Sequence, residues 1–293
     1  MSLTFVVESF KFYKLKDTRL VQALFLLAFA LNFFMLAFPM GDRDFSVFLN
    51  YVMALLRQPD FLMKPSRLLP ADNATGLLTI QNLLFLLGEG IRTLVNGLLV
   101  IFYASLMQVR VADYPREDGI RNYFKKLPSL ILFFLLLLVP YIFSFFFIQL
   151  PFYILLSFLA FTPLFLIDRG LNMSQAMDLS LSKTYGLKFQ MVVAFIILNF
   201  IISLPSNLLL SLLGSGGSAI SSALIKSFFQ ALQVMMAGRL YGLFYTYRNR
   251  MASINKGPWG QDDADDMLRF LLEINRKSQI DNRDSDNEDN DDT

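Results

Sequence analysis

The stretch DRGLNMSQAMDLSLSKTYGLKF, residues 168–189, is polar and lies between two long apolar runs. Asn172 is a favoured N-cap, and Gln175 follows it at capping-box spacing. Gly186 stands where a helix commonly ends in a left-handed residue. We therefore expect a helix over residues 173–185. Such a helix is too short and too polar to cross a membrane, so it lies at the membrane surface or under a helical bundle.

Two interpretations of this cytoplasmic connector helix remain open. It either joins two membrane crossings without forming a site, or it provides contacts for other proteins. Asp178 lies off the face that carries the small and apolar side chains. That face holds Met173, Ala176, Met177, Ser180, Leu181 and Thr184. The residues of interest in the helix are Asn172, Asp178, Ser180 and Gly186.

A short series of residues precedes the next apolar run: Asp168, Gly170, Ala176, Met177, Ser180 and Gly186. In this series the chain resembles a group of bacterial six-helix membrane proteins. The group includes the YciC-like proteins and the membrane domain fused to some glycerophosphodiester phosphodiesterases. The resemblance extends through residues 5–250 and implies a bundle of six crossings. It does not imply an enzyme, because the chain carries no phosphodiesterase domain.

The composition favours a membrane protein, since 55% of the 293 residues are hydrophobic and only 17% are charged. About 20 apolar residues are enough to cross a bilayer. The sequence therefore predicts an all-α integral membrane protein with six crossings within residues 18–247. We expect Pro140 to kink the third crossing and Pro205 to interrupt the fifth. The expected crossings are residues 18–40, 80–107, 127–148, 152–167, 187–213 and 219–247.

The other segments are polar or amphipathic. Residues 41–79 form an insert after the first crossing, and residues 168–188 contain the connector helix. Residues 1–17 are amphipathic, which predicts either a helix on anionic lipid headgroups or a positive flank that orients the first crossing. Residues 248–277 are expected to form a tail with an amphipathic helix. Residues 278–293 are acidic and are expected to be disordered.

Lysine and arginine are rare in the insert at residues 41–79 and concentrated in four other segments: residues 1–19, 108–127, 168–188 and 248–293. Six crossings place these four segments on the same side of the membrane. The positive-inside rule then predicts that both termini lie in the cytoplasm and that the insert lies outside. The resemblance to bacterial membrane proteins implies that this membrane is the plasma membrane.

Polar residues inside the expected crossings occur at similar depth: Asn32, Glu89, Arg92, Asn96, Asn207, Lys226 and Gln230. Ionisable residues at depth are costly and usually face protein or water. One interpretation is an outward-opening cavity, floored by Glu89, Arg92 and Lys226, that accepts an anionic group. The other is that Glu89 pairs with Arg92, Lys226 extends to the surface, and the amides join helices.

Gly238 and Gly242 form a GxxxG spacing in the sixth expected crossing. This spacing lets two helices approach closely. The contact lies either inside the bundle or between two copies of the chain, and we favour the bundle.

The chain has no Cys and no His. It therefore has no Ser-His-Asp triad, no cysteine nucleophile and no thiolate or histidine metal ligands. Walker A, GxGxxG and HExxH motifs are also absent. We expect no cofactor, no metal site and no nucleic-acid partner. The basic residues at 110–126 lie beside the bilayer, which favours binding to anionic headgroups.

Two functions fit these features. The first is a non-catalytic membrane protein that organises or assists envelope or lipid-related components, with residues 262–277 as a contact for a protein partner. The alternative is a transporter or permease that handles a lipid or small anionic solute through the polar layer of the first, second, fifth and sixth crossings. An intramembrane enzyme fits less well, because Glu89 and aspartates alone would have to supply its chemistry.

Overall fold

The computed structural model describes residues 2–13, 18–50, 79–111, 116–146, 150–213 and 218–254. Within these ranges the chain is helical and forms no strand, which confirms the all-α class. The helices are α1 (Ser2–Ser9), α2 (Thr18–Ala37), α5 (Ile80–Val111), α6 (Arg116–Phe146), α7 (Leu150–Leu159), α8 (Thr162–Asp168), α9 (Met173–Lys183), α10 (Lys188–Leu213) and α11 (Ala219–Ile254).

Five of the described helices are long and apolar enough to cross a membrane, namely α2, α5, α6, α10 and α11. No more than 33% of the residues in the apolar part of each is buried in the bundle. Their outer surfaces expose large apolar side chains such as Phe34, Leu136 and Phe200. So much exposed apolar surface is unfavourable in water and favourable in lipid. The five helices are those of a multi-pass membrane protein.

The expected fourth crossing, residues 152–167, is broken into two short helices. α7 ends at Leu159, a turn occupies residues 160–161, and α8 begins at Thr162. Pro163 lies in the first turn of α8. Proline has no backbone N–H, and its ring collides with the carbonyl four residues earlier, so one straight helix does not continue through this position. The segment is therefore not one of the five long helices.

Three prolines lie inside the long helices, Pro128 and Pro140 in α6 and Pro205 in α10, and they do not break them. α6 continues through Pro140, and α10 continues through Pro205. The prediction that Pro205 interrupts the fifth crossing is wrong. In apolar surroundings no water can bind a backbone group that loses its partner. A helix therefore keeps its remaining backbone hydrogen bonds on either side of a proline.

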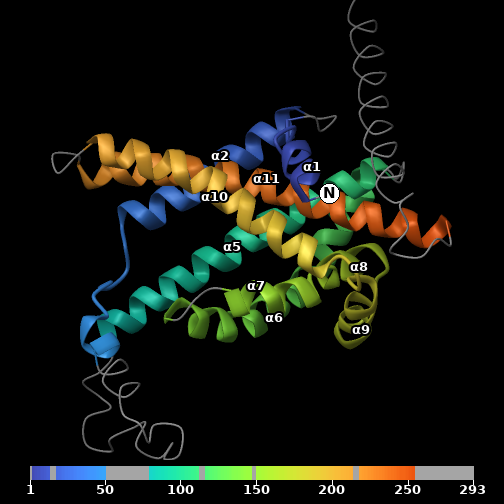
Figure 1. Cartoon of the computed structure of the whole chain (residues 1–293), viewed down its shortest axis with the longest axis horizontal. Coiled ribbons are helices and arrows are strands. Elements are labelled where there is room, and N and C mark those ends of the chain that lie inside the picture. The colour runs from blue at the N-terminus through green and yellow to red at the C-terminus, as the bar shows by residue number, and fades with distance from the viewer. Residues whose placement is uncertain are drawn as a thin grey trace, which may run out of the picture.

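The long helices form two layers, with α2, α10 and α11 on one side and α5, α6 and α7 on the other (Figure 1). α11 packs on α2, α5 and α10 and so connects the layers. We use two names for the ends of the bundle. The hairpin end, at the left in Figure 1, is where α10 ends and α11 begins. The α9 end, at the right, is where α1, α8 and α9 lie.

The Gly238 and Gly242 pair lies where α11 packs on α5. A Cβ atom at position 238 would lie 2.8 Å from the Cβ atom of Tyr103, and one at position 242 would lie 2.8 Å from the sulfur of Met107. Both distances are shorter than ordinary carbon contacts. At position 238 only glycine permits this approach, because the opposing atom is a Cβ, whereas the flexible end of Met107 can move away from position 242. The pair therefore lies at a contact inside the bundle.

The N-terminal helix α1 packs against α10 and α11 at the α9 end. Phe5 and Val6 are fully buried, and the ring of Phe5 lies 4.3 Å from that of Phe244. Glu8 forms a buried ion pair with Arg239 at 2.9 Å, and the backbone carbonyl of Glu8 accepts a second hydrogen bond from Arg239 Nε. This pairing satisfies a charge that α11 would otherwise carry uncompensated inside the bundle.

The expected amphipathic helix over residues 1–17 is shorter in the structure, because α1 ends at Ser9 and residues 14–17 lie outside the described ranges. Its outward face exposes Leu3 and Val7. An apolar outward face is the feature that the predicted contact with lipid headgroups requires.

Two other predictions fall largely outside the described residues. Of the insert at residues 41–79, the structure describes residues 41–50 and 79. There the side-chain amide of Asn82 donates to the carbonyls of Asp42 and Asp44, which ties the end of α2 to the start of α5. The predicted tail contact at residues 262–277 and the acidic segment at residues 278–293 lie beyond the last described residue.

We predict that Gly238→Ala destabilises the folded bundle by about 1–3 kcal/mol, the usual cost of adding a methyl group to a packed interior. The Cβ atom of Tyr103 cannot move away unless α5 shifts. Unfolding in mixed micelles measures the effect. Gly88→Ala is the matched control, because a Cβ atom there would lie 3.5 Å from Met40, an ordinary contact. Equal stabilities of the two variants would contradict the close packing of α11 on α5.

Candidate functional site

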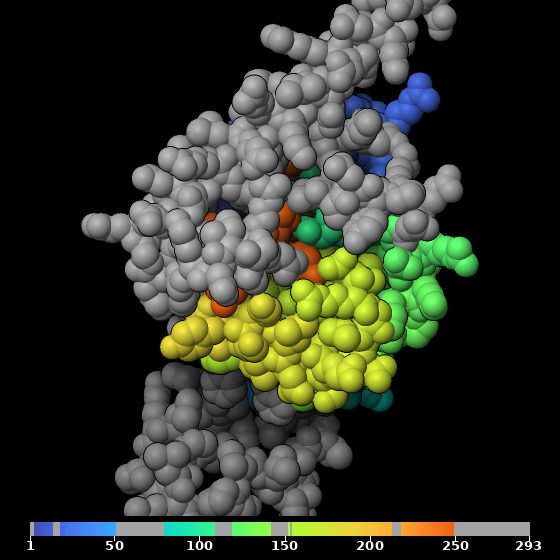
Figure 2. Space-filling model, turned by 90° about the vertical axis from the view of Figure 1, so that its right-hand side faces the viewer, coloured from blue at the N-terminus to red at the C-terminus, as the bar shows by residue number. Residues whose placement is uncertain are grey.

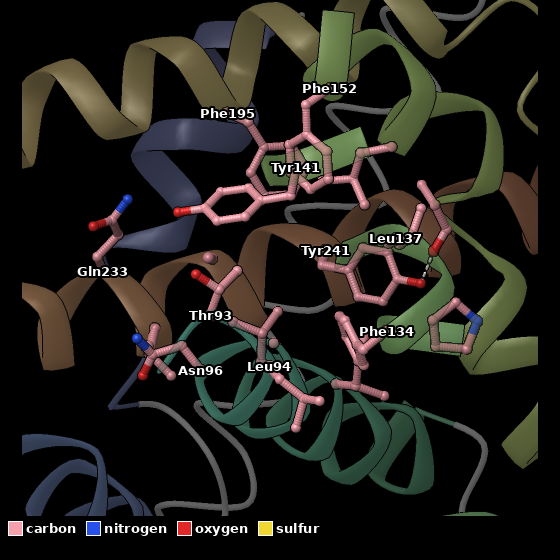
Figure 3. Close-up of a pocket in the computed structure, with 18 of the residues that line it drawn as sticks. Thr93, Leu94, Asn96, Phe134, Leu137, Tyr141, Phe152, Phe195, Gln233 and Tyr241 are labelled. Atoms are coloured by element: carbon pink, nitrogen blue, oxygen red, sulfur yellow. Dashed lines mark hydrogen bonds between the residues drawn. The ribbon is translucent and has the colours of Figure 1, made fainter. Parts of the chain in front are cut away.

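A cavity of about 430 Å³ lies between the two layers of the bundle (Figure 3). Side chains from α5, α6, α7, α10 and α11 line it, together with Ala160 and Pro163 at the break between α7 and α8. Each of these helices packs on the next, and α11 packs again on α5, so the five close a ring around the cavity. Its volume lies within the range found for small-molecule sites.

Two hydrogen-bonded pairs of polar side chains join helices across the cavity wall. Gln233 on α11 donates from Nε2 to Oδ1 of Asn199 on α10, at 3.1 Å. Arg92 on α5 donates from Nη1 to Oε1 of Gln230 on α11, at 3.2 Å. At 1.5 Å per residue, Arg92 lies about 18 Å and Gln233 about 21 Å from the hairpin-end start of its helix. Both pairs therefore lie deep within the apolar part of the bundle.

On α5, α10 and α11 the cavity lining is polar toward the hairpin end and apolar toward the α9 end, whereas α6 faces the polar part with apolar side chains such as Leu138, which lies against Gly90. Figure 3 shows Thr93, Asn96 and Gln233 on one side of the cavity, away from Phe134 and Tyr241. The helix directions agree, because the polar residues of α5 and α11 precede the apolar ones that line the same helices further along: Val100, Ile101, Val234 and Ala237. A molecule with a polar head and an apolar body matches this arrangement.

Among the described residues that line the cavity, Arg92 is the one with a charged side chain. Its guanidinium group forms an ion pair with Glu89, three residues earlier on α5. Only 18% of the Arg92 side chain and 17% of the Glu89 side chain are exposed. Because the two charges are adjacent and opposite, the cavity wall carries no net charge at this point.

The structure brings together most of the polar residues that the sequence placed in one layer. Asn32 on α2 and Asn96 on α5 exchange two amide hydrogen bonds, at 2.8 Å and 3.0 Å. Asn207 and Lys226, in contrast, have exposed side chains and do not line the cavity. Of the two interpretations of this layer, the floor of Glu89, Arg92 and Lys226 that accepts an anion is therefore not assembled. The contacts match the other one, in which Glu89 pairs with Arg92 and amides join helices.

Sequence reasoning selected Asn207 on α10, whereas Asn199 lines the cavity. Eight residues separate them, and eight residues at 3.6 per turn rotate a helix by about 80° beyond two full turns. The two amides therefore lie on different faces. One feature of the sequence could have indicated Asn199. It lies in the middle of an apolar run, where a polar side chain usually faces protein.

The break between α7 and α8 forms part of the cavity wall, at Ala160 and Pro163. Its free backbone groups are bound by side chains from other helices. The hydroxyl of Ser180 accepts a hydrogen bond from the N–H of Phe161 at 3.0 Å and donates to the carbonyl of Phe158 at 3.1 Å. The Tyr241 hydroxyl donates to the carbonyl of Ala160. α9 and α11 thus complete the hydrogen bonding that α7 and α8 cannot complete alone.

The connector helix α9 begins where its sequence suggests but ends two residues earlier than expected, because Lys183 is its last residue and residues 184–187 form a turn. The N–H of Asn172 donates to Oε1 of Gln175 at 3.4 Å, and Gly186 has a φ of +81°. Ser180 is fully buried and Asp178 is exposed. Figure 2, which views the α9 end, shows the residues around α9 in yellow on the surface. One face of α9 therefore supports the helix break, and the opposite face is exposed.

We predict that Ser180→Ala destabilises the fold by about 1–3 kcal/mol, because a buried N–H and a buried carbonyl both lose a partner. Ser182→Ala is the matched control, since Ser182 lies on the exposed side of the same helix. Thermal unfolding in detergent compares the two. Equal melting temperatures would show that the hydroxyl of Ser180 does not support the break.

Comparison of the chain with protein-family models, with curated proteins and with solved structures gives no match. The resemblance carried by residues 168–186 thus stays a prediction.

Proposed function

We propose that this chain is a transporter- or permease-like membrane protein that holds a small amphipathic molecule in the cavity between its two layers. We further propose that the broken pair α7–α8 is an interrupted fourth crossing, which makes six crossings in total. In this arrangement both termini are cytoplasmic, the hairpin end faces outward, and the protein lies in the plasma membrane.

The cavity is the observation that carries this proposal. It lies deep in the bundle, has a polar and an apolar end, and is bordered by a helix break at Ala160 and Pro163. Irregular backbone is tolerated inside a membrane where it lines a cavity, and transporters commonly bind their substrates beside interrupted helices. Amide side chains at such depth also provide polar contacts for a molecule that enters from water.

The other function considered, organisation of envelope components, depended on a protein contact at residues 262–277. Those residues lie outside the described ranges. The cavity is an internal feature that a purely organising role does not require, so it favours the transporter-like function.

Cysteine labelling tests whether the cavity admits small molecules, because the natural chain contains no cysteine. Asn199 lines the cavity, whereas the adjacent residue Phe200 is 65% exposed on the outer face of α10. A thiol reacts as its thiolate, which forms in a hydrated site and not in lipid. We predict that Asn199→Cys reacts with N-ethylmaleimide at least about tenfold faster than Phe200→Cys in reconstituted membranes.

The two positions are neighbours at nearly the same depth, so differences in reagent partitioning largely cancel. Adding Ala237→Phe, which places a ring in the cavity, should slow the labelling of Asn199→Cys and leave that of Phe200→Cys unchanged. Equal labelling of the two cysteines would mean that the cavity stays closed, and the transporter-like function would then be rejected.

A further inference from the structure

We infer that the molecule held in the cavity has an uncharged head that both donates and accepts hydrogen bonds, such as a primary amide or a hydroxyl, attached to an apolar body. This inference rests on the proposed function and names the class of molecule that the same cavity selects.

The charges around the cavity argue against an ionic head. Arg92 is compensated by Glu89, and Lys226 is exposed and does not line the cavity. An anionic head would therefore meet no unpaired cation at the lining. An ion in such a place has lost its water without gaining a counter-charge, which is unfavourable by several kcal/mol.

The hydrogen-bonding groups favour a head of mixed character. In the contact between Gln233 and Asn199, Gln233 uses its NH₂ group and Asn199 uses its oxygen. The NH₂ group of Asn199 and the oxygen of Gln233 are not used by this contact, so the pair offers one donor group and one acceptor group. A primary amide or a hydroxyl satisfies both, whereas a carboxylate only accepts and an ammonium group only donates.

The rest of the cavity matches an apolar body. Toward the α9 end the lining changes to aliphatic and aromatic side chains, including Ile101, Phe134, Phe195 and Val234. Burial of an apolar chain against this surface is favourable in proportion to its area. The molecule would therefore lie along the bundle axis, with its head toward the hairpin end and its body toward the α9 end.

The experiment uses the chain with Ala237→Cys, a small change at the apolar end of the cavity, reconstituted in phosphatidylcholine nanodiscs. The rate of reaction with the uncharged reagent methyl methanethiosulfonate is measured alone and with octanamide, octanoate or octylammonium at equal concentration in the membrane. We predict that octanamide slows the reaction about tenfold when it is present at about ten times its dissociation constant. Octanoate and octylammonium at the same concentration should leave the rate nearly unchanged.

Two further substitutions test the role of charge. Glu89→Gln leaves Arg92 without its counter-ion, so octanoate should gain protection in that variant. Lys226→Met removes an exposed charge that does not line the cavity and should leave all three amphiphiles unchanged. The comparison of octanamide with octanoate on the Ala237→Cys chain alone decides the inference if Glu89→Gln fails to fold.

The outcomes separate this inference from the proposed function. Protection by octanoate equal to or greater than that by octanamide would overturn the uncharged head, while the cavity itself would stand. If neither Ala237→Cys nor Asn199→Cys reacted with its reagent, the cavity would be closed to small molecules. The proposed function would then be overturned together with the inference.

Discussion

The helix break at residues 160–161 depends on hydrogen bonds from outside its own helices. A break inside a membrane protein frees backbone N–H and carbonyl groups where no water can bind them. Here Ser180 binds the N–H of Phe161 and the carbonyl of Phe158, while Tyr241 binds the carbonyl of Ala160. The connector helix α9 and the long helix α11 are thereby held to the break. This constraint places α7 beside α10 and closes the ring of helices around the cavity.

The side chains that hold the bundle together also give the cavity its chemistry. Arg92 binds Gln230 across α5 and α11, and Asn199 binds Gln233 across α10 and α11. Each contact stabilises a helix pair and places a polar group on the lining. The ion pair of Arg92 with Glu89 satisfies a charge within one helix and leaves the lining without net charge. Packing and the proposed selectivity therefore rest on the same residues, and a substitution at one of them is expected to change both.

Pro140, Pro163 and Pro205 lie in apolar helical segments, and of these three only Pro163 accompanies a break. Pro140 and Pro205 lie within continuous helices, whereas Pro163 begins α8. The ring of proline disfavours a straight helix at all three positions. The three positions differ in the side chains that surround them. The turn before Pro163 is bound by hydroxyl groups from α9 and α11. Sequence reasoning treated the prolines individually and so placed an interruption at Pro205, where the structure has none.

The sequence alone determined the helical class, the long apolar helices and the start of α9, because these follow from local composition and spacing. It also indicated Glu89, Arg92 and Gln230 as interior polar residues, since ionisable groups are costly in an apolar run. Only the tertiary structure decided that Asn199 lines the cavity while Asn207 and Lys226 are exposed. It also decided the pairing of Glu8 with Arg239, which are 231 residues apart. The reason is that contacts between residues far apart in the sequence set the rotation of each helix about its axis and the helices that it packs against. Local sequence patterns carry no information about such contacts.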